Sequence, residues 1–297
     1  MRGSRSIDTH IDVVAICCEG QAESPAFHAA YLLLRDTARL SAGGNNMCFD
    51  IDSSPPIPHI HGGSVTHEDL TLTARDGNRF AAFSAEAPGD VAVLVLPDVR
   101  GLFKFYEELT LRFAEHGFDA LAIDYFGRTA GVSKRPNDWD FWPDVTATTI
   151  SGIESDVRAG IDHLRRTDPK KPVFIVGFCF GGSNAWHMAA SDVGCNGVVG
   201  FYGHPDKADF PSGAPPVISR VDDFSCPVLG LQGGDDPGIP VEVDERFADA
   251  MEAAGKDGEV VVYDNAPHSF FDRKYEEFAE DSADSWNRIL GFIESNT

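Results

Sequence analysis

One cysteine, Cys179, lies at the end of an apolar run in the hexapeptide GFCFGG (177–182). The pattern G-x-nucleophile-x-G is typical of a sharp strand-to-helix turn that exposes the central side chain. Glycines two residues before and after the nucleophile are required there, because the backbone approaches itself closely. The spacing therefore predicts a thiol nucleophile at Cys179, and a small buried structural cysteine is the alternative interpretation.

Two later segments could supply the other groups that a thiol nucleophile needs, a general base and an acid that orients it. Asp235 or Asp236 follows one apolar run in GGDDPGIP (233–240), and His268 follows the last apolar run in NAPHSFFD (265–272). The order nucleophile, acid, histidine is that of α/β-hydrolases. These residues predict acyl transfer, with the choice between the two aspartates left open.

Further candidates lie in two earlier loops. The backbone N–H groups of Val99, in LPDVRGL (96–102), and of Phe180 are the expected donors of an oxyanion hole. Asp98 is expected to reach the thiol. Arg128, in IDYFGRTAG (123–131), either anchors a substrate carboxylate or forms an ordinary surface ion pair.

These candidates need a scaffold that brings distant loops together, and the apolar pattern predicts one. Apolar runs expected to be strands alternate with segments of helical spacing, and Asp76-Gly77 marks a hairpin turn. Strands that are apolar throughout predict a mostly parallel sheet with helices on both faces in a single α/β domain. Ligands bind such sheets at the carboxyl ends of the strands. The expected strands are 91–97, 119–127, 172–178, 197–203, 227–234 and 259–266, and the expected helices include 103–113, 150–164, 243–254 and 286–293.

Composition narrows the class of function. The 297-residue chain has a formal net charge of −23, which argues against nucleic-acid and anionic-membrane partners. Its six cysteines form no C-x-x-C pair and no metal-ligand spacing, which favours free thiols in a reducing cytoplasm. We expect a small-molecule substrate, neither metal nor cofactor, and a monomer or small homo-oligomer.

The first 66 residues differ in composition from the rest. They mix Ser, Gly, Asn, Pro and His and end in SSPPIPHIHGG (53–63), a pattern typical of a poorly ordered extension and linker. We hypothesise that residues 1–46 are not native and that translation starts at Met47. His59 and His61 lack further ligands and do not predict a metal site.

The motifs LPDVRGL, IDYFGRTAG, GFCFGG, GGDDPGIP and PHSFFD, in that order, resemble those of the dienelactone hydrolase family, the carboxymethylenebutenolidase-like α/β-hydrolases. The resemblance covers about residues 66–297, and the expected domain is 67–297. It implies a triad of Cys179, His268 and Asp236, because the family's aspartate stands four residues before the proline at Pro240. It also implies that Arg128 binds a substrate carboxylate.

Two positions depart from the family pattern. Asp98 stands where the best-known members have a glutamate that holds the resting thiol. Asp272 stands where the prototype has a second arginine, with Arg273 next to it. The resemblance implies opening of an enol-lactone or cleavage of a small activated ester through a thioester. The alternatives are a general carboxylesterase on small neutral esters and a non-catalytic ligand-sensing scaffold.

Overall fold

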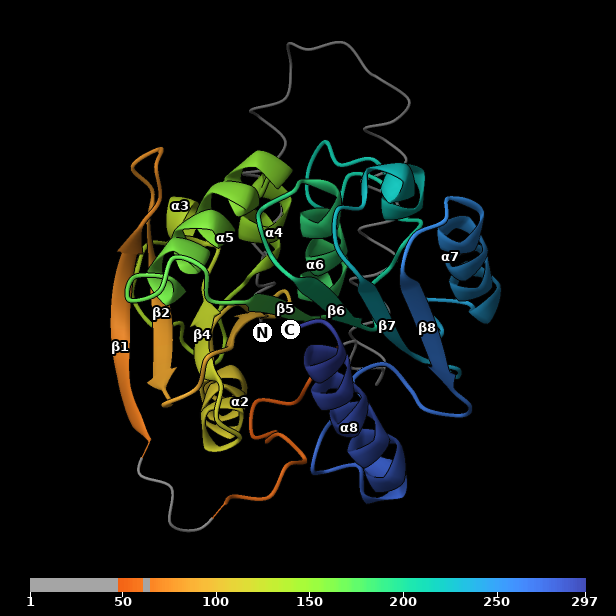
Figure 1. Ribbon diagram of the computed structural model, residues 1–297, viewed down its shortest axis with the longest axis horizontal. Helices are drawn as coiled ribbons and strands as arrows, with labels where there is room; N and C mark the ends of the chain where they lie inside the picture. Colours follow the sequence, from red (N-terminus) through yellow and green to blue (C-terminus); the bar gives the residue numbers. More distant parts are fainter. Residues whose placement is uncertain (1–47, 61–64) are drawn as a thin grey trace, which may run out of the picture. The chain divides into compact units, whose positions relative to one another are not determined.

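A computed structural model describes residues 48–60 and 65–297. In this part of the chain, eight strands form one sheet in the order β1-β2-β4-β3-β5-β6-β7-β8 (Figure 1). The strands are β1 (Thr66–Thr73), β2 (Arg79–Glu86), β3 (Ala92–Leu96), β4 (Asp119–Ile123), β5 (Val173–Phe178), β6 (Gly197–Phe201), β7 (Val228–Gly233) and β8 (Gly258–Tyr263). Strands β4, β3, β5, β6, β7 and β8 run parallel, which confirms the predicted fold class.

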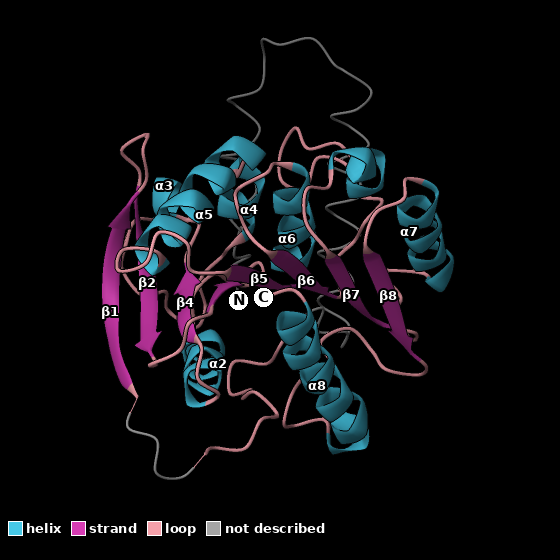
Figure 2. Ribbon diagram, in the orientation of Figure 1, coloured by secondary structure: helices cyan, strands magenta, loops and turns pink. Residues whose placement is uncertain are grey.

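Helices cover both faces of the sheet (Figure 2). They are α2 (Lys104–Glu115), α3 (Gly127–Ala130), α4 (Trp142–Ala147), α5 (Ile150–Leu164), α6 (Phe180–Ala190), α7 (Val241–Ala253) and α8 (Ala279–Ser295), with 3-10 helices η1 (Val217–Asp223) and η2 (Glu276–Phe278). Helices α5, α6 and α7 lie on one face, and α2 and α8 on the other. Within the described residues, no helix has the length and apolarity that a membrane crossing requires.

Each apolar strand contributes to two cores because successive side chains point to opposite faces. In β3, Leu94 and Leu96 pack under α5 and α6, whereas Val93 and Val95 pack toward α2 and α8. All four side chains are fully buried. This double burial explains why the strands are apolar throughout instead of alternating.

The hairpin predicted at Asp76-Gly77 joins β1 to β2, which pair antiparallel from Thr66↔Glu86 to Thr73↔Arg79. Gly77 has a φ of +87°, a value that glycine adopts without strain. The predicted strand 119–127 ends earlier, at Ile123. It stops there because the Asp124 carboxylate accepts a hydrogen bond from the N–H of Phe126 and turns the chain into α3.

Residues 48–60, which we call the N-terminal strap, differ from the loosely held linker that their composition suggested. The strap contains no helix or strand, yet Phe49 and Ile57 are buried in the core shared with α2 and α8. These two buried side chains thus hold a proline-rich segment on the domain. The hypotheses about residues 1–46, the start at Met47 and His61 lie outside the described residues.

Candidate active site

The turn between β5 and α6 carries Cys179 in a strained conformation, with φ +54° and ψ −114°. A Cβ atom on Gly177 would lie 2.0 Å from the carbonyl oxygen of Gly181, and one on Gly181 would lie 2.1 Å from that of Leu96. Only glycine fits at either place, as the sequence pattern required. The Cys179 N–H donates to the Phe201 carbonyl across the ladder at 2.9 Å, which fixes the turn at the carboxyl edge of the sheet.

The structure brings Asp236 and His268 together from the loops after β7 and β8. The Oδ2 atom of Asp236 lies 2.5 Å from Nδ1 of His268. The other carboxylate oxygen of Asp236 accepts the N–H of Gly238 at 2.8 Å. Asp236 is buried and Asp235 is exposed, so the geometry favours Asp236 as the orienting acid. Among the described residues, the buried Nε2 of His268 has no hydrogen-bond partner.

Cys179 and His268 form a charged pair at neutral pH. The pKa of Cys179 is lowered to about 5, first by a hydrogen bond from Cys48 and then by the positive charge of His268, against the opposing effects of burial and of Asp98. Burial by itself lowers the pKa of His268, yet the Cys179 charge and the bond with Asp236 raise it to about 10. The resting site therefore holds a thiolate beside an imidazolium.

The two expected oxyanion donors lie at adjacent strand ends. Phe180 is the first residue of α6. A Cβ atom on the next residue, Gly181, would lie 2.4 Å from the carbonyl oxygen of Pro97, so this helix start packs directly on the end of β3, just before Val99. Neither the Val99 nor the Phe180 N–H donates to another described residue. A helix N-terminus with a free N–H stabilises negative charge.

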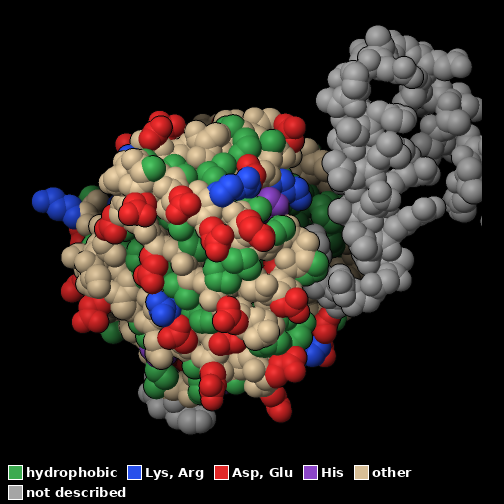
Figure 3. Space-filling model, turned by 90° about the vertical axis from the view of Figure 1, so that its right-hand side faces the viewer, with side chains coloured by type: hydrophobic (Ala, Val, Ile, Leu, Met, Phe, Trp, Pro, Cys, Tyr) green, Lys and Arg blue, Asp and Glu red, His purple; other side chains and the backbone are tan. Residues whose placement is uncertain are grey.

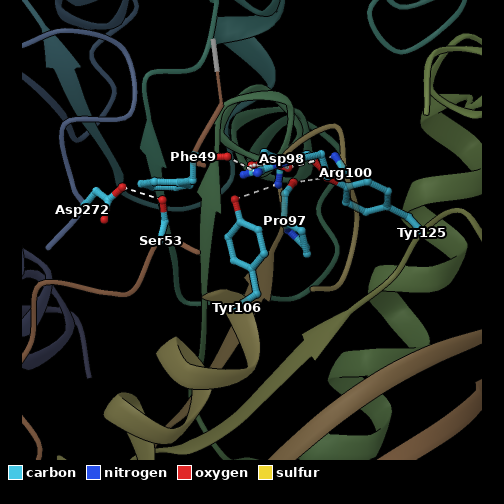
Figure 4. Close-up of polar contacts among 8 residues, drawn as sticks. All are labelled: Phe49, Ser53, Pro97, Asp98, Arg100, Tyr106, Tyr125 and Asp272. Carbon is cyan, nitrogen blue, oxygen red and sulfur yellow. Dashed lines mark hydrogen bonds and ion pairs between the residues drawn. The ribbon is translucent and has the colours of Figure 1, made fainter. Parts of the chain in front are cut away.

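Asp98 is buried near the thiol, but its carboxylate is engaged by Arg100 (Figure 4). Arg100 Nη2 lies 2.6 Å from Asp98 Oδ2, and the Arg100 backbone N–H donates to Oδ1 at 2.8 Å. Arg100 also donates to the carbonyl oxygen of Phe49 in the strap. Asp98 therefore contributes negative charge near Cys179, while its oxygens hold Arg100 and, through it, the strap.

The structure does not bring Arg128 into this group. Its guanidinium lies 2.6 Å from Asp76 Oδ2 and 2.9 Å from Asp156 Oδ1, and it also donates to the carbonyl oxygen of Gly152 at 3.0 Å. These contacts tie α3 to the β1–β2 turn and to α5. The observed role of Arg128 thus matches its alternative interpretation, an ion pair.

Asp272 and Arg273, the departures beyond the histidine, both bind the strap. Ser53 Oγ donates to Asp272 Oδ2 at 2.6 Å (Figure 4). The Arg273 backbone N–H donates to the Ser54 carbonyl, and its guanidinium donates to the carbonyls of Pro55 and Ile57. The place where the family prototype has a second arginine is used here to hold the chain's own N-terminal segment.

Sequence reasoning missed two residues at the site, Cys48 and Tyr202. Cys48 lies in the strap and had no signal, because nothing in its surroundings predicted contact with the domain. Tyr202 directly follows β6 opposite Cys179, and its ring centroid lies 4.9 Å from that of His268. Its buried hydroxyl has no hydrogen-bond partner among the described residues. Its position at a strand end, next to the elbow strand, could have identified it.

A cavity of about 340 Å³ lies beside the strap, between the start of α2 and the loop before α4. Ile51 of the strap lines it, and so does Arg100, which donates to the strap carbonyl of Phe49. Its other lining residues include aromatic and basic side chains: Phe103, Lys134, Arg135, Trp139 and Phe141.

The known proteins that match this chain point to one family. The chain matches the model of the dienelactone hydrolase family over residues 80–296. It is 31% identical over 230 residues to a provisionally named carboxymethylenebutenolidase of Methylorubrum extorquens, covering 74% of this chain and 78% of that protein. It is 27% identical to the carboxymethylenebutenolidase of Rhodococcus opacus, covering 84% and 96%. A provisionally named dienelactone hydrolase structure from Klebsiella pneumoniae superposes with a TM-score of 0.69 at 25% identity, covering 78% and 99%.

Proposed function

The chain belongs to the dienelactone hydrolase family, and from this premise we propose that it opens small lactones or cleaves small activated carboxylic esters through Cys179, His268 and Asp236. The observation that carries the proposal is the 2.5 Å contact between Asp236 and His268 beside a thiol on a strained turn. A histidine oriented by an acid next to a nucleophile is the arrangement that acyl transfer requires.

Acylation begins from the charged pair. The Cys179 thiolate attacks the carbonyl carbon, and the N–H groups of Val99 and Phe180 receive the oxyanion; each such donor is worth about 3 kcal/mol. The tetrahedral intermediate collapses to a thioester, the carbon–oxygen bond to the leaving group breaks, and the His268 imidazolium gives its proton to that oxygen. A lactone suits this step because its leaving oxygen stays tethered to the acyl group.

In deacylation His268 must act as a base, whereas in acylation it acts as an acid. Once Cys179 is acylated, its negative charge is gone, and with it a main cause of the raised pKa of His268. The neutral imidazole, held by Asp236, then takes a proton from water, and the resulting hydroxide attacks the thioester. The thiolate leaves as the carboxylic acid is released, which restores the thiolate–imidazolium pair.

The nucleophile assignment is tested by Cys179→Ala. We expect the rate of hydrolysis of a p-nitrophenyl ester to fall about a thousandfold or more, with the far-ultraviolet circular dichroism unchanged. Cys226→Ala is the matched control, because Cys226 lies 3.6 Å from Cys195 in a separate thiol pair. Retained turnover in Cys179→Ala with the fold intact would refute the triad.

One observation favours the second candidate, a general carboxylesterase on small neutral esters. Arg128, the residue expected to bind a substrate carboxylate, is held by Asp76 and Asp156. A panel that pairs a carboxylated enol-lactone with a neutral aryl ester of similar reactivity separates the candidates. Preference for the carboxylated lactone supports the lactonase, and equal kcat/KM values support the esterase.

A further inference from the structure

Two cysteines form a thiol pair away from the proposed active site. The sulfur atoms of Cys195 and Cys226 lie 3.6 Å apart in a hydrogen-bonding contact, although 31 positions separate the two residues in the chain. Both are free thiols in the structure. Nothing in the proposed hydrolysis uses either thiol, so the contact has no role in ester cleavage.

The pair lies at the amino ends of two neighbouring parallel strands. Cys195 stands two positions before the first residue of β6, and Cys226 stands two positions before that of β7 (Figure 1). The strands pair in parallel from Val198↔Val228. Cys179 follows the carboxyl end of β5, at the opposite edge of the sheet. The five residues of β6, about 16 Å of extended chain, therefore separate the pair from the nucleophile.

The backbone beside each cysteine is held by hydrogen bonds. The N–H of Asn196 donates to the Val173 carbonyl at 2.7 Å, and the Asn196 side-chain oxygen accepts the Val173 N–H at 3.2 Å. On the other side, the N–H and the Oγ of Ser225 both donate to the carbonyl of Ala189, at 3.0 and 2.9 Å. The contact between the sulfur atoms is thus set by the sheet and by the end of α6, because both fix the neighbouring backbone.

The pair lies at the margin of the core and not inside it. Cys195 and Cys226 pack against the buried residues on the α5–α6–α7 face of the sheet, yet both side chains are only half-buried. Each is preceded by an exposed residue, Gly194 in one case and Ser225 in the other. A small reagent can therefore approach the pair from this end of the sheet.

We propose that Cys195 and Cys226 are a redox-active dithiol, which a small-molecule disulfide converts into a reversible disulfide bond between the starts of β6 and β7. The sulfur–sulfur distance must shorten from 3.6 Å to the bonded value of about 2.05 Å. The proposal does not rest on the proposed function, because neither thiol belongs to the triad.

The reaction consists of two thiol–disulfide exchanges, written here for glutathione disulfide. In the first, the Cys226 thiolate attacks one sulfur of glutathione disulfide; a mixed disulfide forms, the original sulfur–sulfur bond breaks, and one glutathione leaves as its thiolate. In the second, Cys195 gives up its proton and attacks the Cys226 sulfur, and the second glutathione leaves. The protein loses two electrons and two protons, which reduce the glutathione disulfide to two thiols. A dithiol reductant reverses both exchanges.

The surroundings of the two sulfur atoms determine which one attacks first. The pKa of Cys226 is lowered, chiefly by the hydrogen bond from Cys195, against the opposing effects of burial and of Asp192. The same hydrogen bond, together with burial and the charge of Cys226, raises the pKa of Cys195, although Arg165 opposes this. Because the thiolate is the nucleophile, Cys226 attacks the reagent and Cys195 closes the bond.

The bond would join two segments that the fold already places together. One is the loop between α6 and β6, and the other is the segment between η1 and β7. A covalent link across 31 positions restricts the unfolded chain more than the folded one. Oxidation of the pair should therefore stabilise the fold.

The experiment equilibrates the full-length Cys179→Ala protein with mixtures of reduced and oxidised glutathione, so that the proposed nucleophile does not consume the reagent. Remaining thiols are blocked with iodoacetamide, and peptides are mapped by mass spectrometry without reduction. As oxidised glutathione increases, we expect a peptide linking Cys195 to Cys226, about 2 Da lighter than the two thiol peptides together. The Tm of the linked protein, measured by differential scanning calorimetry, should rise by about 3–8 °C and return after dithiothreitol.

Cys195→Ser, made in the same background, separates the first exchange from the second. We expect this variant to keep glutathione on Cys226, to form no link and to show no increase in Tm. Cys195→Ala should give the same result and covers the case in which the serine hydroxyl disturbs the packing. Cys48→Ser is the matched control, and the link should form in it as before.

The peptide map decides the proposal. Alkylated or glutathione-bound Cys195 and Cys226 at every glutathione ratio, with no linked peptide, would overturn it. A disulfide from either residue to another cysteine in place of this link would overturn it as well. A linked peptide with an unchanged Tm would establish the dithiol and refute the stabilisation of the fold.

Discussion

Cys179 and His268 carry opposite charges in the resting protein, and each stabilises the ionised form of the other. A serine at the elbow would need a base to remove its proton, whereas the lowered pKa of Cys179 favours the thiolate at neutral pH. Asp98 acts in the opposite sense, since its negative charge raises the pKa of Cys179.

The pH dependence of alkylation reports this charge state. Because the pKa of Cys179 is lowered to about 5, the thiolate fraction rises as the pH rises through about 5 and is then constant to pH ~8. We expect the rate of iodoacetamide labelling at the Cys179 peptide, followed by mass spectrometry, to show the same rise and plateau. In Cys48→Ala the midpoint should move to higher pH, because the leading hydrogen-bond donor is lost. A rate that still climbs between pH 8 and 9 in the wild type would contradict the thiolate.

At the scale of elements, the site depends on how separate segments are tied together. The strap is held by the Asp98–Arg100 pair on one side and by Asp272 and Arg273 on the other. On the far side of the sheet edge, Arg128 ties α3 to α5 and to the β1–β2 turn. Two of these contacts use positions that the family resemblance linked to substrate binding, namely Arg128 and Asp272, the place of the second arginine.

Arg128→Ala tests whether the ion pairs of Arg128 with Asp76 and Asp156 serve stability alone. Asp156 is fully buried, and burial raises its pKa to about 6, so loss of the arginine would leave a poorly compensated carboxyl group. We expect the free energy of unfolding to fall by about 1–3 kcal/mol, and kcat/KM to change by the same factor for carboxylated and neutral substrates. The measurements are urea unfolding and the two-substrate comparison.

Arg75→Ala is the control for that variant. Arg75 lies in the β1–β2 turn, as Asp76 does, and forms an exposed ion pair with Asp162 of α5. Little change in the urea midpoint is expected there. A KM increase in Arg128→Ala confined to carboxylated substrates, with unchanged stability, would instead make Arg128 the carboxylate anchor.

At the scale of the whole molecule, the dominant feature is the excess of acidic side chains. The formal net charge is −23, and acidic groups are spread over the face shown in Figure 3, where basic groups are few. Like charges at the surface repel one another and oppose compaction. The basic residues near the cavity, Arg100, Lys134 and Arg135, each pair with a carboxylate, so they do not form an uncompensated positive patch.

Salt should therefore stabilise this protein. Raising NaCl from about 20 mM to about 500 mM shortens the Debye length to a few ångströms and screens the surface repulsion. We expect the Tm, measured by differential scanning calorimetry at pH 7.5, to rise by about 2–4 °C. At pH ~5, where carboxyl protonation lowers the net charge, the increase should be smaller. A Tm that falls with salt at pH 7.5 would show that surface ion pairs outweigh the repulsion.

Local sequence rules determined the alternation of strands and helices and the place of the elbow. Apolar runs such as 92–96 can be predicted as strands from the sequence, because burial on both faces of the sheet permits no polar residue. Gly177 and Gly181 indicate the turn in the sequence, because a Cβ atom would clash with the backbone at either position. The order of Cys179, Asp236 and His268 along the chain predicted that their loops meet at one edge, since the carboxyl ends of parallel strands do so.

Only the tertiary structure decided what surrounds the thiol. Cys48 lies near Cys179 because contacts join segments more than a hundred residues apart, which no local pattern encodes. The pairing of Arg128 was likewise undetermined, because a guanidinium binds whichever carboxylate the fold brings nearest, and this chain has 47 acidic residues. The sequence thus predicted a nucleophile at Cys179 and determined its edge of the sheet, and the packing of distant segments decided which side chains surround it.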